Sequence, residues 1–154
     1  MSTIDARLTE LGLTLPQAAA PAANYVPFVR TGNLVVISGQ ITLENGVLKY
    51  VGRVGEDFTT EQAYEAAKLC GLNLIAQLKA ACDGDLDRVT RVVRLGGFVN
   101  CTADFTEQPK VINGASDLMA EVFGEKGKHA RAAVGVNTLP LGVAVEIEGL
   151  FEIA

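Results

Sequence analysis

The chain has 154 residues, of which 49% are apolar and 20% are charged. This composition predicts a globular protein and excludes a disordered one, and the length predicts a single domain over residues 1–154. The net charge of −5 argues against a nucleic-acid partner, because binding phosphates requires a basic face and no cluster of Lys or Arg is present.

The N-terminal segment does not combine positive charge with an apolar run, so no signal peptide is expected. No apolar stretch approaches the roughly 18 residues that a bilayer requires, so no membrane partner is expected either. Three cysteines occur in separate contexts, Cys70, Cys82 and Cys101. We interpret them as reduced, buried thiols of a cytoplasmic protein.

The first 24 residues predict a short helix and a connector, with the core of the domain at residues 25–154. Ser2 or Thr3 can cap the helix and Gly12 can end it. A connector rich in Pro and Ala follows, through Asn24. Strands are then expected at residues 25–30 and 34–38. Asn45-Gly46 predicts a hairpin between residues 41–44 and 47–50.

Two long helices are predicted further along. Thr59-x-x-Gln62 has the form of a capping box, and a buried stripe at helical spacing follows until Gly84. Gly71 inside this helix indicates close packing against a neighbour. The second helix carries a similar stripe and ends near Gly124; its apolar positions are Val111, Ala115, Leu118 and Val122.

Strands at residues 89–100, 132–136 and 143–153 complete the prediction, the first with a bulge at Gly96-Gly97. The fold class is therefore α+β, a mixed sheet with two long helices on one face. Residues 34–37 and 92–99 are apolar on both faces of their strands. Since the helices cover only one face, we expect another copy of the chain to cover the other.

Arg131 is the main candidate for binding a ligand. It shares a strand face with Ala133 and Gly135, so a charge lies beside very small residues, as a pocket for a compact anion requires. An Arg can hold a carboxylate with two parallel hydrogen bonds. Glu146 and Glu148 share one face of the last strand, roughly 6.5–7 Å apart, and such a Glu can activate water.

A solvated ion pair between Arg131 and these carboxylates is the alternative. We interpret the single histidine, His129, as a loop residue. No metal-ligand spacing, phosphate-binding loop or nucleophile motif is present in the sequence.

Two motifs resemble the Rid family, also called the YjgF family or L-PSP endoribonucleases. The first is Arg131-Ala-Ala-Val-Gly-Val-Asn-Thr-Leu-Pro-Leu-Gly-Val-Ala-Val-Glu146-Ile-Glu148. The second is Gly32-Asn33-Leu-Val-Val-Ile-Ser38-Gly39-Gln40. The resemblance implies a chorismate-mutase-like fold and a homotrimer with ligand sites between subunits.

By this resemblance the reaction is the hydrolysis of a 2-imino acid, such as 2-iminobutyrate, to a 2-keto acid and ammonia. Arg131 would bind the substrate carboxylate and Glu146 would position the water. The substrate-binding residues would be Tyr25, Ser38, Gly39, Asn113 and Ala133. No cofactor and no metal are expected, because a protonated imine is already electrophilic.

The chain departs from the best-known members at Ala133, where they carry a cysteine, and in its N-terminal helix. These departures resemble a divergent branch of the family. Two alternatives stay open: a non-catalytic binder or sensor of small carboxylates that uses the same cleft, and an endoribonuclease. The preferred side chain of the substrate and the role of Glu148 are not specified by the sequence.

Overall fold

A five-stranded mixed sheet lies at the centre of the fold. The computed structural model describes residues 2–20 and 24–154. The strand order is β1-β2-β7-β5-β6; β5 and β6 run parallel, and the other neighbours are antiparallel. The bounds are β1 (Phe28–Thr31), β2 (Leu34–Gln40), β5 (Val89–Asn100), β6 (Ala130–Val136) and β7 (Val145–Ile153).

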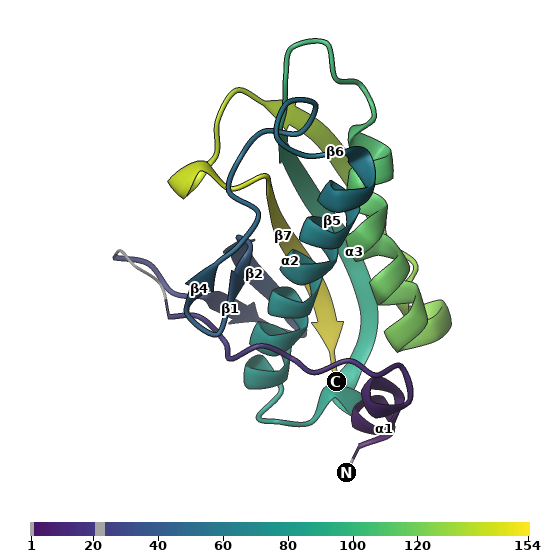
Figure 1. Cartoon of the computed structure of the whole chain (residues 1–154). Coiled ribbons are helices and arrows are strands. Elements are labelled where there is room, and N and C mark those ends of the chain that lie inside the picture. Colours follow the sequence, from purple (N-terminus) through teal and green to yellow (C-terminus); the bar gives the residue numbers. More distant parts are fainter. Residues whose placement is uncertain (1, 21–23) are drawn as a thin grey trace.

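Two long helices, α2 (Thr60–Ala81) and α3 (Gln108–Phe123), lie side by side on one face of this sheet (Figure 1). The capping box begins α2 as predicted: the Thr59 side chain accepts a hydrogen bond from the Gln62 amide, and the Gln62 side chain accepts one from the Thr59 amide. The close packing predicted at Gly71 is confirmed, since a Cβ at this position would lie 2.9 Å from Leu118 Cδ2. The predicted fold class is confirmed.

The N-terminal helix α1 (Thr3–Glu10) is attached through its own backbone. Its first amides, those of Thr3 and Ile4, donate to the Asp87 carboxylate at 2.8 and 2.9 Å. Asp87 lies in the short helical turn η1 (Leu86–Arg88), immediately before β5. Arg7 Nε donates to the Glu121 carbonyl on α3 at 2.8 Å. The predicted helix is therefore present and docked against the core.

The predicted hairpin also forms, as a separate two-stranded sheet of β3 (Leu43–Glu44) and β4 (Val47–Leu48). Asn45 and Gly46 both have positive φ, 51° and 86°, as a type I′ turn requires.

The bulge predicted at Gly96-Gly97 is wrong. The register of β5 against β7 shifts earlier, between Val89 and Arg91 and again between Val92 and Arg94. The two glycines serve packing instead. A Cβ at residue 97 would lie 2.6 Å from Ile112 Cδ1, and one at residue 96 would lie 2.9 Å from Glu148 Cγ.

The face of the sheet opposite α2 and α3 has no covering element in the described chain. Exposed valines lie on it, Val29, Val36 and Val134, and register places Val29 directly beside Val36. We call this surface the open face. Among the described residues, no helix has the length and apolar character needed to cross a membrane.

Candidate functional site

Arg131 lies on the helix-covered face of the sheet. It pairs with Leu95 of β5, whose buried side chain packs into the core beneath the helices. Because paired residues on neighbouring strands share a face, the Arg131 side chain extends towards α3. There Nη1 donates to Ser116 Oγ at 3.1 Å and Nη2 donates to the Pro109 carbonyl at 3.2 Å. A guanidinium has five N–H donors, so three remain for a ligand.

Two other predicted residues lie with Arg131. Asn113 is four residues after Pro109 and three before Ser116 on α3, a spacing that places all three on one side of the helix. Ala133 follows Arg131 on the same face of β6 and packs, partly buried, against the core. Arg131, Asn113 and Ala133 therefore form one group, the arginine half-site.

The structure adds Ser116 and His129 to this group. His129 lies in the connection between η2 (Gly124–Gly127) and β6, a loop as predicted. Its Nε2 is 2.8 Å from Ser116 Oγ, and its Nδ1 is 2.6 Å from the Gly127 carbonyl oxygen. Neither contact could be predicted from the sequence, because both depend on how α3 packs beside the start of β6.

Glu146 lies on the opposite, open face. It alternates along β7 with the buried residues Val145 and Ile147 and pairs with Phe98 of β5. Gly39 on β2 is directly beside it, and a side chain at residue 39 would occupy the space of the Glu146 carboxylate. Burial, and then the negative charge of Glu148, raise the pKa of Glu146 above its ordinary value. A carboxylate with a raised pKa is a stronger base.

The ion pair considered for Arg131 does not form within the chain. Glu148 pairs instead with Arg94 Nη1, at 3.7 Å, and both side chains are about half exposed. Since Arg131 and Glu146 lie on opposite faces of one sheet, neither carboxylate of β7 can reach the Arg131 guanidinium in the same copy. The solvated Arg131–Glu pair is therefore wrong, and Glu148 has its own partner.

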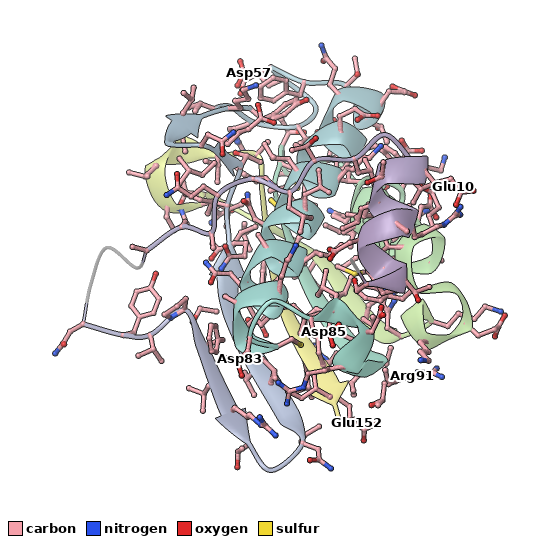
Figure 2. All side chains as sticks on the ribbon, turned by 90° about the horizontal axis from the view of Figure 1, so that it is seen from below. Glu10, Asp57, Asp83, Asp85, Arg91 and Glu152 are labelled. Atoms are coloured by element: carbon pink, nitrogen blue, oxygen red, sulfur yellow. The ribbon has the colours of Figure 1, made fainter. Side chains whose placement is uncertain are left out.

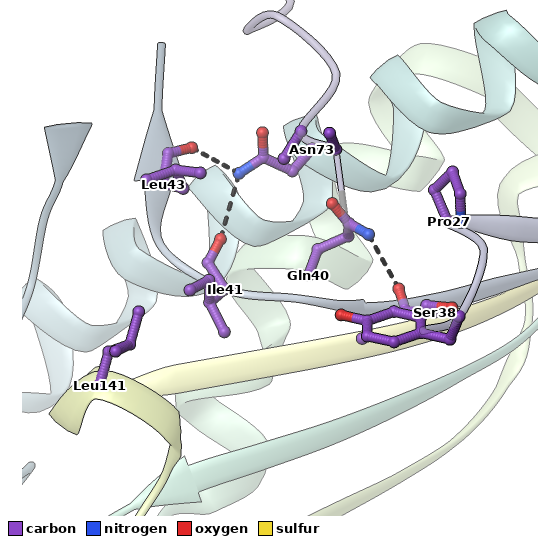
Figure 3. Close-up of a pocket in the computed structure, with 11 residues that line it drawn as sticks. Pro27, Ser38, Gln40, Ile41, Leu43, Asn73 and Leu141 are labelled. Carbon is purple, nitrogen blue, oxygen red and sulfur yellow. Dashed lines mark hydrogen bonds between the residues drawn. The ribbon is translucent and has the colours of Figure 1, made fainter. Parts of the chain in front are cut away.

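A cavity of about 190 Å³ brings together Tyr25, Ser38 and Gly39 (Figure 3). Ser38 donates to the Val26 carbonyl at 2.8 Å, and Gln40 Nε2 donates to the Ser38 carbonyl at 2.9 Å. The other wall is the connector after α1, with Ala19 and Ala20. With Glu146 next to Gly39, we call Tyr25, Ser38, Gly39 and Glu146 the glutamate half-site.

Asn73 of α2 supports the far side of this cavity. Its side-chain amide is almost fully buried and donates to the Ile41 carbonyl at 3.1 Å and the Leu43 carbonyl at 2.7 Å, as Figure 3 shows. Gln77, one helical turn later, donates to the Ala19 carbonyl at 2.7 Å. Two buried amides of α2 therefore fix the β2–β3 connection and the N-terminal connector around the cavity.

The predicted residues thus fall into two half-sites on opposite faces of one chain. One offers a cation that suits a carboxylate, and the other offers a carboxylate of raised pKa next to Gly39, a residue that also lines the cavity. Among residues 2–20 and 24–154, no group of three or more His, Cys, Asp or Glu could hold a metal ion.

Comparison with known proteins shows the family to which the chain belongs. The family model described as YjgF/chorismate mutase-like, putative endoribonuclease, matches residues 5–151. Protein TCP17 of Trypanosoma cruzi is 48% identical, covering 97% of this chain and 94% of the relative. The 2-iminobutanoate/2-iminopropanoate deaminase of Dermatophagoides farinae is 27% identical, covering 90% and 92%.

Among solved structures, protein Atu1372 of Agrobacterium tumefaciens, described as having unknown function, superimposes with a TM-score of 0.92. It is 51% identical and covers 98% of this chain and 92% of that chain. Fold and matched residues thus define an α+β protein of the chorismate-mutase-like class. The chain belongs to the YjgF/chorismate mutase-like family, and the family resemblance is confirmed.

Proposed function

We propose that this protein hydrolyses reactive 2-imino acids to 2-keto acids and ammonia at a site formed between two copies of the chain. The observation that carries the proposal is the division of the site. A guanidinium with free donors lies on one sheet face and a carboxylate of raised pKa lies on the other. A relative at 27% identity carries the name of this activity.

Arg131 is the proposed carboxylate anchor. Ser116 and Pro109 occupy two of its donors, and the remaining three suffice for a bidentate contact with one carboxylate. Such a contact would fix both the position and the rotation of a small imino acid. Asn113 lies between the two partners of Arg131 on α3 and would contact the same end of the substrate.

Glu146 is the proposed general base. A water oxygen attacks the protonated imine carbon while Glu146 accepts one water proton, which gives a carbinolamine. Glu146 then passes this proton to the carbinolamine nitrogen and accepts the hydroxyl proton as the C–N bond breaks, so ammonia leaves and the carbonyl forms. One water is consumed, and the released ammonia takes the proton from Glu146 to leave as ammonium, which regenerates the carboxylate. The backbone of Gly39 lies beside this reaction, and Tyr25 and Ser38 would enclose the substrate side chain.

A second copy is required because no single chain brings the two half-sites together. The open face exposes Val29, Val36 and Val134, and exposed apolar surface of this kind is typical of subunit interfaces. We propose a homotrimer, the assembly that the family resemblance implies, in which Arg131 of one copy meets Glu146 of the next.

The test is the consumption of 2-iminobutyrate generated in situ, followed by the release of ammonia. The protein is expected to accelerate loss of the imine over the spontaneous rate, and Arg131→Ala to abolish that acceleration. Arg91→Ala is the matched control, since Arg91 is exposed on β5 and extends outward near Glu152 (Figure 2). Equal rates for wild type and Arg131→Ala would contradict the proposal. A 2-keto acid that raises Tm without any turnover would favour a binder instead.

A further inference from the structure

Arg131 is the first member of a directed chain of hydrogen bonds. Its Nη1 lies 3.1 Å from Ser116 Oγ, Ser116 Oγ lies 2.8 Å from His129 Nε2, and His129 Nδ1 lies 2.6 Å from the Gly127 carbonyl oxygen. The three side chains are all partly buried, so water competes less for these contacts than at the surface.

The chemistry of the two ends fixes the donor and acceptor of the outer bonds, and for a neutral imidazole it also fixes the bond between Ser116 and His129. A guanidinium can only donate and a backbone carbonyl can only accept. Nδ1 of His129 must therefore carry its proton towards Gly127. In a neutral imidazole Nε2 is then the acceptor, and the Ser116 hydroxyl donates to it. The lone pairs of Ser116 Oγ are left for Arg131, so with a neutral imidazole the chain has only one consistent direction.

We propose that Ser116 and His129 are positioning residues that hold the Arg131 guanidinium in the orientation needed to receive a carboxylate. The assignment rests on the proposed function, because it concerns the same ligand. The Pro109 carbonyl restrains Nη2 from the first turn of α3, while Ser116 restrains Nη1 from two turns later. Together the two contacts prevent rotation of the guanidinium plane. A bidentate contact with a carboxylate requires such a fixed plane.

The first experiment needs no variant. Because the chain contains a single histidine, the imidazole nitrogen signals of the ¹⁵N-labelled protein belong to His129 without further assignment. We expect the neutral tautomer with the proton on Nδ1. A proton on Nε2 at neutral pH would overturn the proposed direction of the chain.

The second experiment measures binding of 2-ketobutyrate by calorimetry and turnover of 2-iminobutyrate. Ser116→Ala should weaken binding on the order of tenfold, as loss of a hydrogen bond to a charged group does. KM should rise by a similar factor while kcat stays nearly unchanged, since an anchor holds ground state and transition state alike. Ser116→Thr keeps the hydroxyl and should restore most of the affinity.

Asp117→Ala is the matched control on the next residue of α3. It removes the 2.7 Å hydrogen bond between Tyr64 and Asp117, which joins α3 to α2 and does not contact Arg131. Its affinity for 2-ketobutyrate should equal that of wild type. Equal losses in Ser116→Ala and Asp117→Ala, or no loss in Ser116→Ala, would overturn the positioning role.

The Arg131 side-chain NMR signals separate this inference from the proposed function. In Ser116→Ala these signals should sharpen, because the guanidinium group rotates more freely, whether or not the imine is consumed. If wild type binds 2-ketobutyrate without turnover and Ser116→Ala weakens that binding, the deaminase proposal fails while the positioning role stands. If turnover is present but the Arg131 signals are unchanged in Ser116→Ala, the positioning role fails alone.

Discussion

Glu146 and Glu148 are two residues apart on the same face of β7, yet their surroundings differ. Glu148 is half exposed and paired with Arg94, whereas Glu146 is partly buried beside Gly39. Burial raises the pKa of Glu146, and the charge of Glu148 raises it further. Glu148 therefore influences the pKa of Glu146, the proposed base.

This relation predicts a change in pH dependence. Glu146 must be ionised to accept a proton, so kcat/KM should rise as pH rises through the pKa of Glu146. Glu148→Gln removes the like charge and should lower that pKa, which moves the acid limb of the profile to lower pH. Glu152→Gln, a carboxylate four residues further along β7 (Figure 2), is the control and should leave the limb in place. An acid limb that does not move in Glu148→Gln would contradict the assignment of Glu146 as base.

At the scale of elements, glycines allow the close contact between α2 and α3. Gly114 on α3 lies directly against the backbone of α2, and a Cβ at this position would overlap the Tyr64 carbonyl oxygen. Gly71 on α2 makes the corresponding approach to Leu118. Arg131 of the arginine half-site bonds to Pro109 and Ser116 of α3, so the position of its side chain depends on how closely these helices pack.

The sign of the change in the free energy of unfolding caused by Gly114→Ala distinguishes an effect on packing from an effect on helix propensity. Propensity alone would stabilise α3 by up to about 1 kcal/mol. The overlap with Tyr64 should instead destabilise the fold by about 1–3 kcal/mol, as overpacking does. Urea unfolding measures the difference in free energy. Ala120→Gly, on the exposed side of the same helix, gives the propensity term separately. A stabilised Gly114→Ala variant would show that the helices can move apart at no cost.

The elements themselves could largely be predicted from the sequence. Thr59 and Gln62 marked the start of α2 because a capping box is a local interaction, and Asn45-Gly46 marked its hairpin for the same reason. The bulge predicted at Gly96 and Gly97 is wrong because a glycine in a strand indicates either a bulge or a close approach. Only the positions of Ile112 and Glu148 decide between the two.

The candidate site residues could be proposed from the sequence one by one, but their arrangement in space could not. Alternation correctly separated Arg131 and Ala133 from their strand neighbours, and Glu146 from Val145. Which faces of β6 and β7 coincide depends on the register through β5, which no local pattern contains. The contact of Ser116 with His129 joins residues 13 apart across a helix end, and neither residue has a motif.

At the scale of the whole molecule, the division of the site between two faces predicts complementation. Arg131→Ala retains Glu146, and Glu146→Gln retains Arg131, so each variant alone should be inactive. When the two are unfolded together and refolded as a mixture, about a quarter of the sites in a closed ring should combine both intact residues. The mixture should then recover about a quarter of the wild-type rate of imine consumption.

The double variant Arg131→Ala/Glu146→Gln, mixed with either single variant, is the control for this experiment. No site in these mixtures can contain both residues, so no recovery is expected. Recovery in the controls would place the activity elsewhere, and an inactive mixture of the two single variants would contradict a site shared between copies.

The strand order has a consequence for how the chain acquires its structure during synthesis. β7 lies between β2 and β5, so the strand in the middle of the sheet is the last of the five to be translated. Until residues 145–153 leave the ribosome, β1–β2 and β5–β6 are two separate ribbons with no hydrogen bonds between them. The sheet can therefore close only after residues 145–153 have emerged, and until then both ribbons expose unpaired strand edges that can pair with other chains.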